Sequence, residues 1–221
     1  MVTLPVRSFV DPDSKVMKTK LEPVSPKTLM SRKFRREIET VVGSLQEKIY
    51  TPGSHAVALA ANQVGIAERF FVMLTMITEN DGLTDVVRAR RIRKGLPVPE
   101  VKKQLGIVVL INPELISVRG VLAEDWEGCL SYPGKQFLID RYPTIKVKYI
   151  NNKGETVEEE LDGLDARIFL HEMDHLDGIR PIDKAKETRE APKSGFKEED
   201  LREALGEDEE PEETPEDQTE E

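Results

Sequence analysis

A five-residue pattern, His171-Glu172-Met173-Asp174-His175, constrains this chain more than any other feature of its sequence. The two histidines are four positions apart, and residues with that spacing are neighbours on one face of an α-helix. Two imidazoles on a shared helix face are able to bind one metal ion. Glu172 stands beside them, in the position of a group that handles a proton without binding the metal. The pattern therefore predicts a helix that carries a catalytic metal site.

Periodic patterns indicate the elements around this helix. The helix itself is expected from residue 164 to about 176, with Gly178 as its stop signal. An apolar stripe with spacings of three and four predicts a first helix over 29–50. Runs rich in β-branched residues predict strands over 70–74, 107–111, 144–150 and 156–161, and the turn residues 151–154 predict a hairpin between the last two.

A catalytic metal of this kind commonly has three protein ligands, so a third must come from elsewhere in the chain. Cys129 is the only cysteine, and Gly128 and the Pro133-Gly134 turn flank it. A lone cysteine is usually a small buried hydrophobic residue, but with two imidazoles its thiolate would complete a Cys-His-His site. In the segment 56–65, which is rich in alanine, Gln63 offers an amide donor. By itself that segment is a weak signal, because stretches rich in alanine mostly form helices or tight packing.

Charge is concentrated at the end of the chain. Residues 206–221 contain ten acidic residues and no Lys or Arg, whereas residues 1–205 contain 32 basic and 32 acidic residues. The neutral body argues against a general nucleic-acid binder and against specific DNA binding. We expect a domain over 1–184 with an insertion at about 75–104, a mixed-charge extension over 185–205 that is partly helical, and a disordered acidic tail over 206–221.

The composition also bears on location. A single cysteine excludes an intrachain disulfide framework. No apolar run approaches the roughly 20 residues that cross a bilayer, and the N-terminus has no secretory apolar region. We therefore expect a cytoplasmic protein with no membrane partner.

Three segments, in this order, resemble the motifs of the peptide deformylase family. They are Leu59-Ala60-Ala61 with Gln63, then Glu127 to Ser131, then His171-Glu172 with His175. The resemblance covers about residues 5–183 and identifies the domain over 1–184 as a deformylase-like catalytic domain. It implies an α+β fold, with antiparallel β-sheets packed around a central helix that carries the His-Glu-x-x-His motif.

The resemblance also implies a reaction: removal of the N-formyl group from the N-terminal formylmethionine of newly made proteins, with release of formate. Cys129, His171 and His175 are then the metal ligands, and Glu172 is the acid and base. The Gln63 amide and the Leu130 backbone N–H stabilise the oxyanion. Fe²⁺ is the expected ion, with Zn²⁺, Ni²⁺ or Co²⁺ able to replace it. The expected partners are N-formylmethionyl nascent peptides and, transiently, the ribosome, which the arginines between 88 and 93 would contact.

Two other functions compete with this one. A general zinc peptidase would take its third ligand from beyond His175, where the candidates are Glu187, Glu190, Glu198 and Glu199. A deformylase-like protein that binds metal or N-termini without efficient turnover is the other. Ala56 and Ala58 favour it, because they replace two glycines of the first motif in a strand that lines the peptide site.

Overall fold

The computed structural model describes residues 4–51, 54–78 and 103–191. The chain divides into two compact units, Met1–Thr75 with Ile107–Gly195 and Met76–Gly106 with Phe196–Glu221. The second unit lies mostly outside the described residues, and the fold and the site belong to the first. Three expected features also lie outside them: the tip of the insertion with its arginines, the extension beyond residue 191, and the acidic tail.

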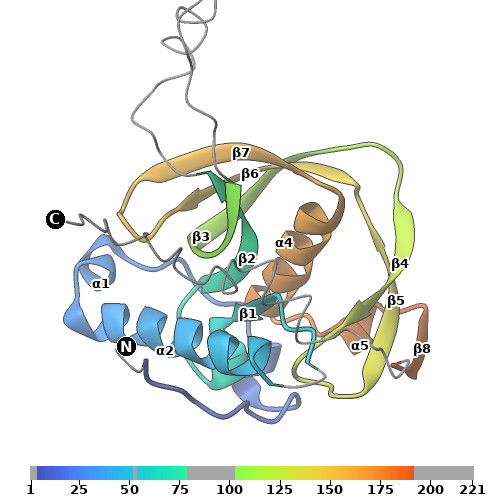
Figure 1. Cartoon of the computed structure of the whole chain (residues 1–221), viewed down its shortest axis with the longest axis horizontal. Helices are drawn as coiled ribbons and strands as arrows, with labels where there is room; N and C mark the ends of the chain where they lie inside the picture. Colours follow the sequence, from blue (N-terminus) through green and yellow to red (C-terminus); the bar gives the residue numbers. More distant parts are fainter. Residues whose placement is uncertain (1–3, 52–53, 79–102, 192–221) are drawn as a thin grey trace, which may run out of the picture. The chain divides into compact units, whose positions relative to one another are not determined.

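Helices and strands are mixed along the described chain, which gives the α+β fold predicted from the sequence (Figure 1). In chain order they are η1 (Lys15–Lys18), α1 (Pro26–Leu29), α2 (Arg32–Ile49), β1 (Ala58–Ala60), η2 (Ala61–Val64), β2 (Phe70–Thr78), β3 (Lys103–Arg119), β4 (Ala123–Gly128), β5 (Lys135–Arg141), β6 (Thr144–Ile150), β7 (Thr156–Asp162), α4 (Gly163–Leu176), α5 (Pro181–Lys184) and β8 (Glu187–Glu190).

The strands form two sheets. One has five strands in the order β1-β2-β3-β6-β7, and the other has three in the order β4-β5-β8. Every strand pair whose register is described is antiparallel. Strands β1 and β4 are therefore edge strands, and each leads directly into a segment of the candidate site.

Helix α2 confirms the first predicted helix but begins three residues later than its apolar pattern suggested. Ser31 caps it, because its hydroxyl accepts a hydrogen bond from the Phe34 backbone N–H at 3.1 Å. Met30, which the pattern placed on the apolar stripe, precedes the cap and is exposed. Phe34, Val41 and Leu45 form the buried face as expected.

Strands β6 and β7 form the predicted hairpin, and the turn at Asn151 closes it as the sequence suggested. The Asn151 side-chain oxygen accepts hydrogen bonds from the backbone N–H groups of Lys153 and Glu155. Strand β3 is longer than its apolar run because it continues past Asn112 and Pro113, where the pairing register with β6 shifts. Residues 187–190, at the start of the mixed-charge extension, form strand β8. The residues whose apolar spacing predicted a helix in that extension, Phe196, Leu201 and Leu205, lie outside the described residues.

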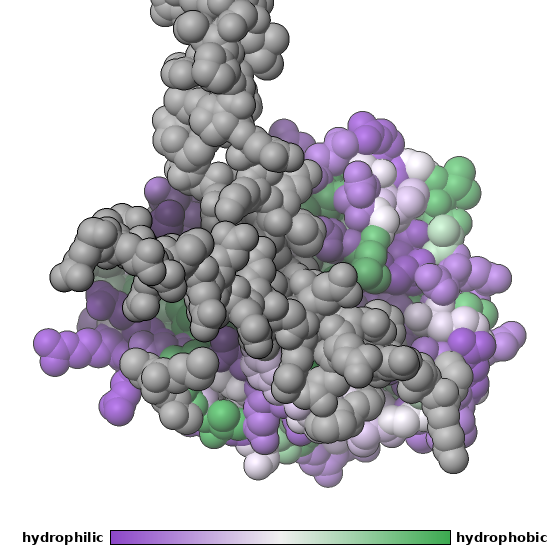
Figure 2. Space-filling view, viewed as in Figure 1, coloured by the Kyte–Doolittle hydropathy of each residue, from purple (hydrophilic) through white to green (hydrophobic). Residues whose placement is uncertain are grey.

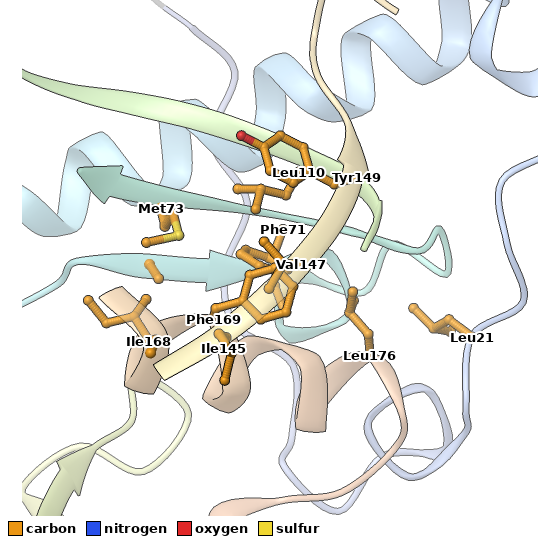
Figure 3. Packing of buried hydrophobic residues seen from close by; sticks show 13 residues of the cluster. Leu21, Phe71, Met73, Leu110, Ile145, Val147, Tyr149, Ile168, Phe169 and Leu176 are labelled. Carbon is orange, nitrogen blue, oxygen red and sulfur yellow. The ribbon is translucent and has the colours of Figure 1, made fainter. Parts of the chain in front are cut away.

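Helix α4 packs against the inner face of the five-stranded sheet (Figures 1 and 3). The ring of Phe169 on α4 meets that of Phe71 on β2 edge to face, with centroids 5.4 Å apart. Gly178, two residues after the end of α4, has a φ of +74°. A Cβ at this position would lie 2.8 Å from the Thr19 backbone. This close approach explains why the helix stops at a glycine.

Arg69 fixes the end of α4 from the start of β2. Its guanidinium is buried and donates to the backbone oxygens of Leu21 and Leu176 and, at 2.8 Å, to the Asp177 carboxylate. The last carbonyl of α4 is thereby satisfied by a charged donor rather than by water. The helix that carries the histidines is held at both its apolar face and its C-terminus.

Hydrophilic side chains dominate the coloured part of the face shown in Figure 2, and hydrophobic ones form small separate patches there. Among the described residues, no helix has the length and apolarity that a membrane crossing requires.

Candidate metal centre

Helix α4 brings His171 and His175 together, as their spacing predicted. Their rings lie edge to face with centroids 5.0 Å apart, and both side chains are buried. Cys129 comes from the residue directly after β4, and its Sγ lies 3.3 Å from His175 Nε2. One ligand atom from each of the three residues lies within 4.8 Å of the other two.

These separations fit a single metal ion. A tetrahedral ion with bonds of about 2.0 to 2.3 Å keeps its ligand atoms about 3.3 to 3.8 Å apart. The Sγ–Nε2 distance falls in this range, and thiolate and imidazole are ligands that suit the divalent transition metals. The cluster is therefore able to hold one divalent ion.

His171 is oriented from behind by Glu127, the last residue but one of β4. Its Nδ1 donates to Glu127 Oε2 at 2.8 Å, which leaves Nε2 as the nitrogen available to a metal. Arg141 binds both oxygens of Glu127, at 2.8 and 2.9 Å, and Arg167 adds a third contact at 2.8 Å. Burial opposes the ionisation of Glu127, but the hydrogen bonds from Arg141 and His171 lower its pKa to about 2.

His175 is held through its backbone. Asn62, from η2, is fully buried, and its Nδ2 donates to the His175 carbonyl oxygen at 2.6 Å. Within the described residues, neither Asn62 Oδ1 nor His175 Nδ1 has a hydrogen-bond partner. The two histidines thus differ in their support: a carboxylate orients the ring of the first, and an amide anchors the main chain of the second.

Glu172 lies beside the cluster in a buried position. Its Oε2 has no hydrogen-bond partner in the described part of the chain, and the side chain is 4% exposed. Burial raises the pKa of Glu172 to about 7, because a carboxylate is poorly solvated there. A carboxyl group with a pKa near neutrality is suited to both accept and return a proton.

Gln63 and Leu130 bring hydrogen-bond donors to the same place. Gln63 is buried, and its Oε1 accepts from the Ala60 backbone N–H at 2.8 Å, which fixes the amide orientation. Its Nε2 faces the Ser131 hydroxyl at 3.0 Å and Cys129 Sγ at 3.7 Å. The Leu130 backbone N–H, next to Cys129, makes no hydrogen bond with the described residues.

Sequence reasoning brought together the residues of this cluster but missed part of its support. Arg141, Arg167, Asp174 and Asn62 were not predicted to have a role in the site. The sequence pattern could have identified Arg141 as an inward-facing residue. Along β5 every second residue points inward, and Arg141 follows Phe137 and Ile139 at that spacing. A charged residue at an inward position requires a buried partner.

The buried Glu127–Arg141 ion pair is expected to stabilise the folded protein. Arg141→Met leaves Glu127 buried without its bidentate partner, and Asp174, which also binds Arg141, loses that partner too. We expect the free energy of unfolding to fall by about 3 to 5 kcal/mol, as is usual when one partner of a buried ion pair is removed. Urea denaturation measures it.

Arg119→Met is the matched control for this variant. Arg119 pairs with Glu160 on the surface, where both side chains are more than half exposed. Its loss should change stability by less than about 1 kcal/mol. Equal effects of the two variants would show that the buried pair has no special importance.

The five-stranded sheet, the helix-borne histidines, the thiolate and the buried carboxylate together are characteristic of a metal-dependent hydrolase. The family model for polypeptide deformylase matches residues 6–191. The chain belongs to the polypeptide deformylase family, whose members are metal-dependent hydrolases that remove N-formyl groups from nascent peptides.

Relatives and solved structures agree with this assignment. A curated peptide deformylase from Thermotoga maritima is 36% identical over 179 residues, which cover 81% of this chain and 85% of that protein. Its Aquifex aeolicus counterpart is 32% identical over 151 residues, covering 68% and 75%. The T. maritima crystal structure aligns with a TM-score of 0.58 at 34% identity, covering 85% of this chain and all of that one. A class I type b deformylase from Acinetobacter baumannii, solved with Met-Ala-Ser bound, has a TM-score of 0.62 at 26% identity and covers 83% and 99%.

These findings confirm the predicted family, fold class, reaction and enzyme class, and they oppose both competing functions. For the peptidase, Glu187 and Glu190 lie exposed on β8 outside the cluster, while Glu198 and Glu199 lie outside the described residues. For the inactive binder, the alanines offer little support. Ala56 and Ala58 are 6% and 7% exposed, and Ala58, the first residue of β1, belongs to the hydrophobic core, so both methyl groups are largely covered by the protein itself.

Proposed function

We propose that Cys129, His171 and His175 bind one divalent metal ion and that Fe²⁺ is the native ion. Support comes from the convergence of their ligand atoms and from the Glu127 hydrogen bond, which presents His171 Nε2 for coordination. The same ligands also accommodate Zn²⁺, Ni²⁺ or Co²⁺. A bound divalent ion supplies a Lewis acid that polarises the formyl carbonyl and makes water more acidic.

The formylated peptide is proposed to bind in an extended conformation between β1 and β4. Both are edge strands, and both run into the site, β1 through Gln63 and β4 through Cys129. Edge strands offer unpaired backbone groups to which a peptide is able to add. The tripeptide bound to the A. baumannii relative supports a peptide-binding site of this kind.

Each remaining residue has one task in the proposed reaction. The Glu172 carboxylate accepts a proton from the attacking water and returns it to the nitrogen of the leaving amine. As the formyl carbon becomes tetrahedral, its oxygen gains negative charge, and the Gln63 Nε2 and the Leu130 N–H donate to it. The C–N bond then breaks, which releases formate and a free amino terminus.

The observation that carries this proposal is the position of buried Glu172, which has an unpartnered carboxylate oxygen next to three converging ligand atoms. Formate release from formyl-Met-Ala, with metal content measured on the same sample, tests it. Acetyl-Met-Ala is the matched control, because its methyl group changes only the acyl position. Cleavage of an unformylated internal peptide bond, without formate release, would contradict the proposal.

The iron-loaded and nickel-loaded forms of the enzyme are expected to keep their activity for different lengths of time. An Fe²⁺ ion beside an oxidisable thiolate should be vulnerable to air and peroxide, whereas Ni²⁺ should not be. We expect iron-loaded enzyme to lose activity in peroxide while nickel-loaded enzyme persists. Thiol titration of Cys129 in both samples locates the damage. Equal decay of the two forms would contradict iron as the sensitive component.

A transient contact with the ribosome and a cytoplasmic location stay predictions from the sequence. The arginines proposed for that contact lie outside the described residues.

A further inference from the structure

Three side chains form a compact group on the three-stranded sheet. The Arg189 guanidinium of β8 lies over the Trp126 ring of β4, 3.9 Å from its centroid. Its Nε and Nη2 both donate to Gln136 Oε1 on β5, at 3.0 and 2.9 Å. A planar cation that is stacked on an aromatic ring and held by two hydrogen bonds is fixed in position before any ligand arrives.

The strand register shows how far Arg189 reaches. Gly128 pairs with Gln136, and Gln136 pairs with Arg189, so the arginine is two strands away from β4, or about 10 Å. Its guanidinium nevertheless lies against Trp126 on β4 itself. The Arg189 side chain therefore reaches past β8 to Gln136 of the middle strand, where it meets the ring that the edge strand β4 contributes.

This group is on the face of the sheet opposite the histidines. Glu127 and its partner Phe137 point inward and are buried, so Trp126 and Gly128, which alternate with Glu127, face outward. A Cβ built on Gly128 would meet no atom of the described residues within 4 Å. Among those residues the outer surface beside Cys129 is thus open, and the guanidinium lies near it.

Arg189 has spare binding capacity. Gln136 occupies Nε and Nη2, and within the described residues no carboxylate forms an ion pair with this side chain. Two acidic residues of the same sheet, Glu124 and Asp140, pair instead with Lys186. The Nη1 of Arg189 is left for another acceptor. A structural arginine would usually bind an acid on a neighbouring strand, and this one does not.

We infer that Arg189, positioned by Trp126 and Gln136, forms a subsite for an acidic side chain at the second or third residue of the substrate. The inference rests on the proposed binding of the peptide along β4. An extended chain advances about 3.3 Å per residue. Trp126 precedes Cys129 by three residues, so a peptide whose formyl group is at the cluster brings those residues to the guanidinium.

Matched peptides test this subsite. Formyl-Met-Ala-Asp and formyl-Met-Ala-Asn, both amidated at the C-terminus, differ only in one charge at the third residue. A second pair, formyl-Met-Asp-Ala and formyl-Met-Asn-Ala, makes the same change at the second residue. In one of the two pairs, we expect kcat/KM at low salt to be about fivefold higher for the Asp peptide than for the Asn peptide. A ratio of about fivefold is the upper range for an exposed ion pair. Arg189→Gln should abolish that preference by raising KM for the Asp peptide, with kcat and metal content unchanged. Arg189→Lys should restore it only in part, since an ammonium lacks the planar fork.

Arg119→Gln is the control, because it removes an exposed arginine from β3 in the other sheet. It should leave the Asp-to-Asn ratio unaltered. The same ratio before and after Arg189→Gln, at both positions, would overturn the subsite. So would an equal loss of kcat on every peptide, which would mean that Arg189 only supports the Cys129 segment. Formyl-Met-Ala turnover separates the two proposals: if it persists while the charge preference is absent, only the subsite fails.

Discussion

Glu172→Gln is expected to lower kcat by about 100- to 10,000-fold, the usual contribution of a general acid and base. Glutamine has nearly the same shape as glutamate but neither accepts nor returns a proton at neutral pH. The side chain is buried, and among the described residues the cluster of candidate metal ligands contains no carboxylate. Steady-state kinetics with formyl-Met-Ala and metal analysis of the same preparation give the two required measurements.

Metal content distinguishes the role of Glu172 from that of a ligand. We expect the variant to bind as much metal as the unaltered protein, because the three ligands remain. Glu158→Gln is the control: it makes the same chemical change on β7, at an exposed residue that pairs with Lys146. If Glu172→Gln lost its metal, the residue would be a ligand and the proposed proton transfer would have no carrier.

Cys129→Ala should remove both metal and activity. The substitution deletes one of three proposed ligands. Even residues that only orient a metal ligand commonly contribute about 10- to 100-fold to the affinity for the metal. We therefore expect metal affinity to fall by more than about 100-fold and activity to fall to background. The thermal shift that added metal produces should also disappear, since that shift reports binding to the folded state.

Ser131→Ala is the matched comparison for metal binding. It removes a polar group of the same loop, one that contacts Gln63 but is not among the three ligand atoms. This variant should keep its metal. Tight stoichiometric binding by Cys129→Ala would show that the two histidines suffice, and the assignment of the thiolate would be wrong.

Local sequence predicted the elements whose signals are contained within one segment. The stripe of α2, the hairpin at Asn151 and the end of α4 before Gly178 each depend on neighbours within a few positions, and the structure confirms them. Strands β4 and β8 had no such signal, whereas the alternation of inward-facing residues along β5 was overlooked. The residues of β4 and β8 are highly charged, and β8 is exposed throughout, so pairing across the sheet rather than local preference makes these two segments strands.

The same distinction applies to the site. The sequence by itself determined which residues are candidates for the site, because a helix fixes the spacing of His171 and His175 and Cys129 is the only thiol in the chain. Tertiary structure alone decided what supports them. Glu127 is 44 residues from His171, and Asn62 is 113 residues from His175, yet each forms a hydrogen bond to its histidine. Such contacts depend on how β4 and η2 pack against α4. The physical reason is burial: a charge or amide removed from water must find a partner in the folded chain, and only the packing of distant segments determines which partner it meets.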